Sequence, residues 1–97
     1  MLATVAVRPE RKAQIPAVVH ADGSARVQTV ARETTPAFWS LINALGDLTG
    51  VPVVLNTSLN GPDEPIACSP DDALKAFHTC DLDALVIGNI VIQRASR

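Results

Sequence analysis

The stretch TPAFWSLINALGDLTGVPVVLNTSLN, Thr35–Asn60, places a helix signal, a strand signal and a polar loop in direct succession. Thr35 suits an N-cap, Pro36 suits the first helical position, and Gly50 suits the residue that follows a helix. Between them, apolar residues recur at the helical spacing, namely Phe38, Leu41, Ile42, Leu45 and Leu48. The pattern predicts an amphipathic helix over 36–49 with one apolar face.

The next residues, Val51–Leu55, form a wholly apolar run that is typical of a strand covered on both faces. Four short polar side chains follow at the end of this predicted strand: Asn56, Thr57, Ser58 and Asn60. Strand ends are the usual location of ligand sites in α/β sheets, and these amides and hydroxyls could bind a phosphate or a carbamoyl group. The same residues could instead form a turn that satisfies its own backbone.

The N-terminal third carries three strand signals and one helical turn. The strands are predicted at Leu2–Val7, 17–20 and 25–31, and the helical turn at 10–15, where Pro16 ends it. The Asp-Gly turn at 21–24 favours a hairpin between the second and third strands. Along the third strand, alternation puts Arg26 and Gln28 on one face and Val27 and Thr29 on the other.

The C-terminal third begins with a second helix at Ser69, where Pro70 takes the first helical position and Asp72 the third, close to a capping box. Strands at 85–87 and 90–92 flank Gly88-Asn89, which could form a tight hairpin or a bulge. The order of elements predicts an α/β (mixed α+β) fold with a mixed twisted sheet and two main helices. We expect a single domain over residues 1–97.

Composition excludes several classes of function. The chain has 97 residues, of which 47% are hydrophobic and 19% charged, as expected of a small globular domain. A net charge of −2 and only 3% aromatic residues argue against nucleic-acid binding. No apolar run approaches the roughly 20 residues of a membrane span, and residues 1–7 are too short for a signal peptide. We therefore expect a cytoplasmic protein with no nucleic-acid or membrane partner.

A few single residues could carry chemistry. Arg26 could clamp a phosphate through two parallel hydrogen bonds, or be an ordinary solvated charge. His20 could orient a ligand or act as an acid or base, or be a partly buried residue at a strand end. Cys68 and Cys80 flank the second helix at a separation of about 15 Å, too far for a disulfide, so we expect reduced thiols. No histidine has ligand-like spacing with them, so we expect no metal site.

Four blocks of the sequence resemble the C-terminal region of the nodulation-type and antibiotic O-carbamoyltransferases. They are PAVVHADGSARVQTV, LTGVPVVLNTSLN, EPIACSPDDALKAF and LDALVIGN, in the same order from about residue 8 to residue 92. The resemblance implies a fragment of a YrdC-like domain that combines carbamoyl phosphate with ATP into carbamoyl adenylate. It implies that Ser58 and Asn60 contact the phosphate or adenylate and that Arg26 clamps carbamoyl phosphate. ATP and carbamoyl phosphate are then substrates, with no metal bound by this chain.

The sequence departs from the family pattern in two ways. Pro62 and Asp63 stand where the family has a basic residue and a glycine, which weakens anion binding and removes the free φ of glycine. The chain also lacks the upstream blocks of the family's C-terminal domain and its whole N-terminal domain, which binds the acceptor and a metal. We therefore expect a part that is inactive alone and that joins a separate N-terminal carbamoyltransferase domain or self-associates. The alternative is a non-catalytic nucleotide-binding or protein-interaction module.

Overall fold

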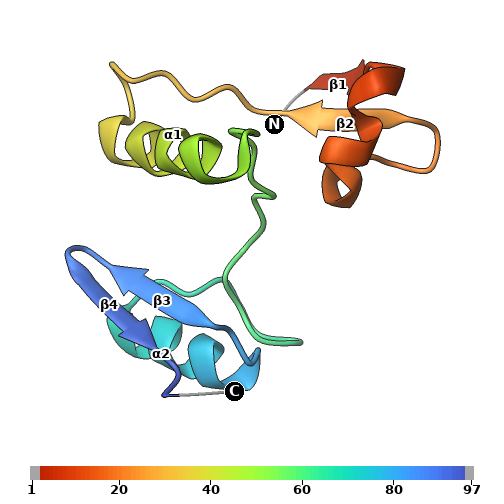
Figure 1. The fold of residues 1–97 in the computed structure, drawn as a ribbon. Helices are drawn as coiled ribbons and strands as arrows, with labels where there is room; N and C mark the ends of the chain where they lie inside the picture. The colour runs from red at the N-terminus through yellow and green to blue at the C-terminus, as the bar shows by residue number, and fades with distance from the viewer. Residues whose placement is uncertain (1–2, 96–97) are drawn as a thin grey trace. The chain divides into compact units, whose positions relative to one another are not determined.

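The computed structural model describes residues 3–95, and the chain forms two compact units (Figure 1). Unit 1 runs to Asn56 and unit 2 begins at Thr57. Unit 1 contains β1 (Ala3–Ala6), the 3-10 helices η1 (Pro9–Gln14) and η2 (Pro16–Val18), β2 (Ser24–Val27) and α1 (Pro36–Thr49). Unit 2 contains α2 (Pro70–Thr79), β3 (Ala84–Ile87) and β4 (Ile90–Gln93). The mixed class with two main helices is confirmed, but the strands form two separate antiparallel pairs in place of one sheet.

In unit 1, β2 pairs with β1 in the register Ala3↔Val27 to Ala6↔Ser24. The predicted hairpin between 17–20 and 25–31 is therefore wrong, and its first strand is largely the helical turn η2. The fixed φ of Pro16 starts this turn, because proline suits the first position of a helix as well as the end of one. The predicted first strand is confirmed for residues 3–6, and Leu2 lies outside the described residues.

The turn at 21–24 is confirmed. Gly23 has φ +84°, and the backbone N–H of His20 donates to the carbonyl of Ser24 at 2.7 Å. Only glycine adopts this left-handed conformation without a steric cost. The turn brings the chain from η2 back into β2, so it fixes the place of His20 beside that strand.

Helix α1 begins and ends as predicted, but its apolar face is not buried. Gly50 has φ +81° and donates its N–H to the Gly46 carbonyl at 2.7 Å, which ends the helix. Thr35 precedes the helix without a side-chain cap. No residue of α1 is buried: Leu41 is 62% exposed and Leu48 is 86% exposed.

The strand predicted at Val51–Leu55 is wrong: the described residues pair no strand with it. The N–H of Val53 instead donates to the carbonyl of Val51 at 2.9 Å, a tight turn around Pro52. Pro52 packs on α1 at Gly46, where an added Cβ would lie 2.9 Å from the proline ring. A β-branched run becomes a strand only when a neighbouring strand accepts its hydrogen bonds, and none is present here.

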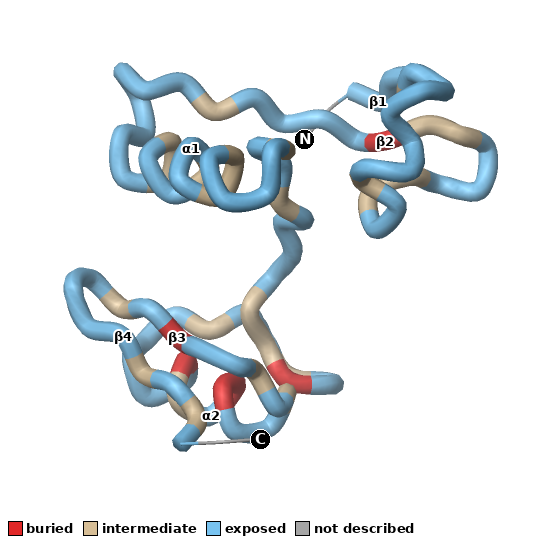
Figure 2. Tube along the Cα trace, in the orientation of Figure 1, coloured by how far each residue is buried: buried red, intermediate tan, exposed pale blue. Residues whose placement is uncertain are grey.

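Unit 2 has a core. The Oγ of Ser69 accepts from the N–H of Asp72 at 3.1 Å, which confirms the predicted cap of α2. Phe77 is 3% exposed and packs with Ala73 and with Leu85 of β3. Figure 2 shows buried residues on α2, on β3 and in the loop before α2, whereas unit 1 has one buried position, on β2.

The strands β3 and β4 pair at Ile87↔Ile90, so Gly88-Asn89 is a two-residue loop with Gly88 at φ +60°. The tight hairpin, not the bulge, is confirmed. Cys68 and Cys80 are both free thiols, as predicted. Within residues 3–95, no helix combines the length and the apolar character that crossing a membrane requires.

Arg94 fastens the end of β4 to the end of α2. Its Nε donates to the Leu82 carbonyl at 2.8 Å and a terminal nitrogen donates to the Phe77 carbonyl at 3.1 Å. The same guanidinium pairs with Asp81 at 3.1 Å and lies over the Phe77 ring. A cation near the C-terminus of a helix interacts favourably with the carbonyls of its last turn, here that of Phe77, which also accepts from the Leu82 N–H at 3.2 Å.

Candidate functional site

Unit 1 contains an open groove of about 820 Å³, the unit 1 groove. It lies among β1, β2, the residues of η2, one side of α1 and residues 52–56. Most of its lining is apolar, and polar groups come from His20, Arg26, Gln28 and Asn56, with Thr29 and Asn43. A largely apolar hollow with a few polar groups is the usual form of a small-molecule site. Three of the six predicted site residues, His20, Arg26 and Asn56, thus line one groove.

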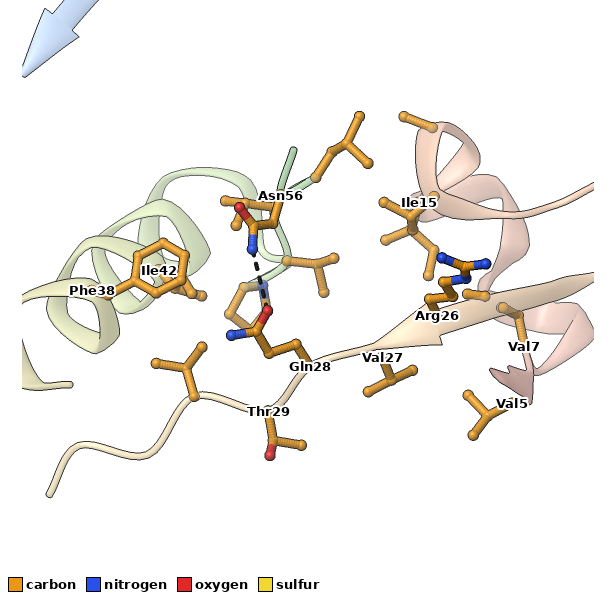
Figure 3. Close-up of a pocket in the computed structure, with 18 of the residues that line it drawn as sticks. Val5, Val7, Ile15, Arg26, Val27, Gln28, Thr29, Phe38, Ile42 and Asn56 are labelled. Carbon is orange, nitrogen blue, oxygen red and sulfur yellow. Dashed lines mark hydrogen bonds between the residues drawn. The ribbon is translucent and has the colours of Figure 1, made fainter. Parts of the chain in front are cut away.

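Arg26 is exposed and presents an unpaired cation to this groove. Figure 3 shows Arg26 and Gln28 on one side of the chain at β2 and Val27 and Thr29 on the other, as the alternation predicts. No residue of the described range 3–95 gives the Arg26 guanidinium a hydrogen bond or an ion pair. A free guanidinium offers two parallel N–H donors that match a phosphate or a carboxylate.

Gln28 is a groove residue that the sequence reasoning did not select. Its Oε1 accepts from the Nδ2 of Asn56 at 3.2 Å, which ties the strand side of the groove to residues 52–56 (Figure 3). The bond leaves the amide nitrogen of Gln28 as a donor and the amide oxygen of Asn56 as an acceptor. The signal that could have found Gln28 is its place two residues after Arg26, on the same face of the strand.

His20 belongs to a short chain of hydrogen bonds with Ser24 and Asp22. The Ser24 hydroxyl donates to Asp22 Oδ1 at 2.6 Å, and His20 Nδ1 lies 3.2 Å from the same hydroxyl oxygen. Because the hydroxyl proton goes to Asp22, Nδ1 is the donor in its bond to Ser24, and Nε2 is the ring nitrogen left for a ligand. The bonds from Ser24 hold the pKa of Asp22 below its ordinary value of 3.8, so Asp22 stays an anion.

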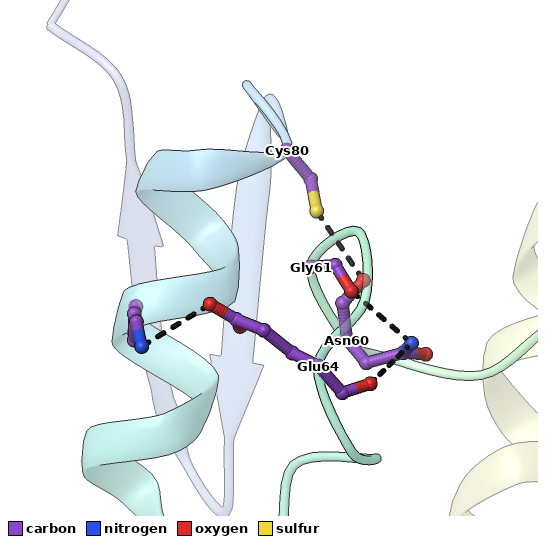
Figure 4. A network of polar contacts seen from close by, with 5 residues as sticks. Asn60, Gly61, Glu64 and Cys80 are labelled. Atoms are coloured by element: carbon purple, nitrogen blue, oxygen red, sulfur yellow. Dashed lines mark hydrogen bonds and ion pairs between the residues drawn. The ribbon is translucent and has the colours of Figure 1, made fainter.

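The remaining predicted residues, Thr57, Ser58 and Asn60, belong to unit 2. Thr57 and Ser58 are exposed, and their hydroxyls have no hydrogen-bond partner among residues 3–95. Asn60 differs, because its Nδ2 donates to the carbonyls of Gly61 at 3.3 Å and Glu64 at 3.0 Å (Figure 4). Its amide nitrogen therefore holds its own loop, and the amide oxygen is the group left for a ligand.

The loop after Asn60 is fastened to α2. Glu64 pairs with Lys75 at 3.1 Å, and the Cys80 thiol donates to the Asn60 carbonyl at 3.5 Å (Figure 4). Gly61 is buried, and an added Cβ would lie 2.8 Å from Glu64 Oε2. Asp63 has φ +60°, the left-handed region that favours glycine. The structure thus gives Asp63 the conformation for which the family pattern has glycine.

Cys68 is a hydrogen-bond donor. Its N–H and its thiol both donate to Asp72 Oδ2, at 3.2 and 3.4 Å. The bond to Asp72 and the negative charge of that carboxylate raise the pKa of the Cys68 thiol above its ordinary value of 9.0. Among the residues that the structure describes, no group of three or more His, Cys, Asp or Glu side chains could hold a metal ion.

The sequence matches the family model described as "Carbamoyltransferase C-terminus" over residues 1–94. The chain belongs to this family. It is 46% identical over 90 residues to the nodulation protein NolO of Bradyrhizobium diazoefficiens, a match that covers 93% of this chain and 16% of the relative. It is 48% identical over 90 residues to the nodulation protein NolNO of Sinorhizobium fredii, covering 93% of this chain and 13% of that protein.

A third relative is named as an O-carbamoyltransferase. The 3'-hydroxymethylcephem-O-carbamoyltransferase of Amycolatopsis lactamdurans is 38% identical over 79 residues, which cover 81% of this chain and 15% of the enzyme. The chain therefore spans about a sixth or less of the length of these three relatives. The resemblance inferred from the four sequence blocks is confirmed at the level of the family.

Proposed function

We propose that this chain is the C-terminal part of an O-carbamoyltransferase, where it helps to bind carbamoyl phosphate and ATP and to form carbamoyl adenylate. Family membership supports the class of reaction, and the Amycolatopsis relative is named for the transfer of a carbamoyl group to a hydroxyl. The observation that carries the proposal is the Arg26 guanidinium, which lines the unit 1 groove with no described partner.

Each polar side chain of the groove has a different proposed contact with the ligand. Arg26 binds a phosphate through two parallel hydrogen bonds, because both substrates carry several negative charges. The amide nitrogen of Gln28 donates to an oxygen of the same ligand, and the free Nε2 of His20 accepts from a carbamoyl NH₂ group. Phosphoryl and adenylyl transfer require positioned donors and positive charge more than a nucleophile from the protein.

The polar loop of unit 2, taken by itself, has hydrogen-bonding groups of another kind. The Thr57 and Ser58 hydroxyls have no partner within residues 3–95, so each can donate to a phosphate oxygen. Asn60 contributes its amide oxygen and keeps the loop in shape through its amide nitrogen. The carboxylate of Asp63 opposes anion binding in this loop.

We assign the acceptor hydroxyl to the part of the longer relatives that lies outside the region matched by these 97 residues. The chain spans 13–16% of the three relatives, so turnover by these 97 residues alone is not expected. The proposed partner is an N-terminal carbamoyltransferase domain, joined to this chain or separate from it.

Titration of the 97-residue protein with carbamoyl phosphate and with ATP, followed by amide NMR, tests the proposal. We expect shifts at residues 24–28 and 56–60, saturating at millimolar ligand. The Arg26→Ala variant should lose the shifts caused by carbamoyl phosphate, because no other described cation is assigned to that phosphate. Arg11→Ala is the matched control, because the Arg11 guanidinium bonds to Gln14 and neither residue lines the groove, so the shifts should be unchanged.

Any of three results would contradict the proposal. The absence of any shift at 10 mM ligand would leave the alternative, a non-catalytic module, as the better account. Shifts that persist in Arg26→Ala and appear equally with inorganic sulfate would show unspecific anion binding. ATP shifts confined to residues 56–60, with none at Arg26, would assign the chain to nucleotide binding alone.

A further inference from the structure

An apolar surface of unit 1 has nothing covering it. It consists of three leucines on one face of α1, Leu41, Leu45 and Leu48, and of Val53 and Leu55 beyond the helix. Leu41, Leu48 and Leu55 are 62%, 86% and 62% exposed. Leu45, Val53 and Leu55 also line a hollow of about 360 Å³. We call these five residues the α1 surface; Arg26 is not part of it.

The backbone next to the α1 surface is also unpaired. Among the described residues, the N–H groups of Val54 to Ser58 donate to no backbone carbonyl, and the carbonyls of this segment accept from no backbone N–H. Val53 and Leu55 are two residues apart, so their side chains would share one face of a strand. An exposed edge of this kind accepts an added strand, and the apolar side chains beside it set the register.

The buried residues show how much of a normal core is missing. The buried hydrophobic residues of the described chain are Ala25, Ala73, Ala76, Phe77 and Leu85. Only the first of them belongs to unit 1. A folded chain of this length ordinarily buries roughly 60–70% of the surface that its unfolded form exposes. Unit 1 therefore has the apolar residues of a core and buries only Ala25 among those described.

We propose that the α1 surface binds an extended apolar segment of the carbamoyltransferase polypeptide outside these 97 residues. The segment adds a strand beside 53–55, and its side chains cover the three leucines of α1. The length of the relatives argues for this occupant, because the matched region is 13–16% of each of them and the remainder is over five times longer. The proposal rests on family membership. Val53 and Leu55 also line the unit 1 groove, but none of the polar groups assigned to the ligand belongs to the α1 surface.

A chimera provides the test. The matched 90 residues of the Bradyrhizobium protein NolO are replaced by this chain, and Leu41→Lys is compared with Ser40→Lys in the chimera and in the 97-residue protein. Ser40 is the matched control, since it is exposed and adjacent but lies on another face of α1. We expect Leu41→Lys to lower the Tm of the chimera by roughly 5 °C or more and to leave the 97-residue protein unchanged. Ser40→Lys should leave both unchanged.

A measurement without substitution complements this test. Amide hydrogen exchange at Val54 and Leu55 should be at least about 100-fold slower in the chimera than in the 97-residue protein, because a paired strand protects its N–H groups. Equal effects of the two lysine variants in the chimera, or equal exchange rates, would overturn the proposal. So would an unsubstituted chimera that does not fold. A dimer of the 97-residue protein that Leu41→Lys dissociates would identify a second copy as the occupant instead.

Discussion

Unit 1 and unit 2 have similar proportions of apolar residues, 28 of 56 and 18 of 41, and bury them to different extents. In unit 2, Phe77 is 3% exposed and Leu85 is 6% exposed, and Arg94 bonds to the carbonyls at the end of α2. In unit 1, Ala25 is the one buried residue that the structure describes, and Leu48 of the longer helix α1 is 86% exposed. Unit 2 therefore has a core of its own, whereas unit 1 leaves Leu41 and Leu48 of α1 exposed.

The two arginines show the same contrast in polar groups. Arg94 makes two hydrogen bonds and an ion pair within unit 2, so its charge is used for stability. Arg26 makes neither with any residue in the described range, which is why we propose it as the phosphate-binding residue. Function-bearing groups are commonly those that the fold itself leaves unsatisfied.

The largest effect is expected from Phe77→Ala. Removing a fully buried phenylalanine costs about 3–5 kcal/mol of the free energy of unfolding, which is a large part of what a small domain has. Unit 2 should then unfold, and the amide signals of α2, β3 and β4 should move to random-coil positions in an NMR spectrum.

Phe38→Ala in unit 1 is the matched control. Phe38 is only half-buried, so its removal should cost about 1 kcal/mol or less and leave the spectrum of unit 2 in place. A loss of stability for Phe38→Ala as large as that for Phe77→Ala would mean that α1 is buried in solution, and the contrast between the units would fail.

Arg94→Met should have the next largest effect. It breaks two charged hydrogen bonds and an ion pair in a partly exposed place, which we expect to cost about 2 kcal/mol in urea unfolding. Arg26→Met should cost less than about 0.5 kcal/mol, because no described contact is lost. If Arg26→Met were as destabilising as Arg94→Met, Arg26 would have a structural role and would no longer be the basis of the phosphate site.

The local signals of the sequence were sufficient for both α-helices and for the last hairpin. Thr35-Pro36 with Gly50, and Ser69-Pro70 with Asp72, mark helix ends through residues within one or two turns. Strands require partners that are distant in sequence. The run at Val51–Leu55 was predicted as a strand from its composition, and it is not one because no neighbouring strand is present. The β1–β2 pairing was missed for a related reason, since the chain between those strands is helical.

In the candidate site, too, local features were predicted correctly and features that depend on distant residues were not. Alternation correctly placed Arg26 of β2 on the same side of the chain as Gln28, which follows the end of that strand, because the period of an extended chain is a local property. The sequence alone did not decide whether the polar loop is a ligand site or a turn whose side chains bond to its own backbone. The amide nitrogen of Asn60 takes part in a turn of its own, whereas the hydroxyls of Thr57 and Ser58 do not. That difference depends on where the Glu64 carbonyl lies.

The smallest effect is expected from breaking the hydrogen bonds between Cys68 and Asp72 at the start of α2. The hydrogen bond from the Cys68 N–H, and to a smaller extent the one from its thiol, lowers the pKa of Asp72 below 3.8. The stabilisation from this carboxylate is therefore present at neutral pH and is lost as the pH falls through its lowered pKa. The anion in turn raises the pKa of the Cys68 thiol above 9.0. Asp72→Asn should return that pKa towards 9.0 and increase alkylation of Cys68 by iodoacetamide at pH 8.5 by roughly two- to fivefold.

Cys80 is the internal control for this variant, because its thiol bonds to the Asn60 carbonyl and not to Asp72. Its alkylation rate should stay the same in Asp72→Asn. An equal increase at both cysteines would mean that the substitution loosens unit 2 as a whole, and the rate at Cys68 would then report unfolding rather than its thiol pKa. An unchanged rate at Cys68 would show that the bond to Asp72 does not persist in solution. The N-terminus of α2 would then be held less firmly than its C-terminus, where Arg94 donates to the Phe77 carbonyl.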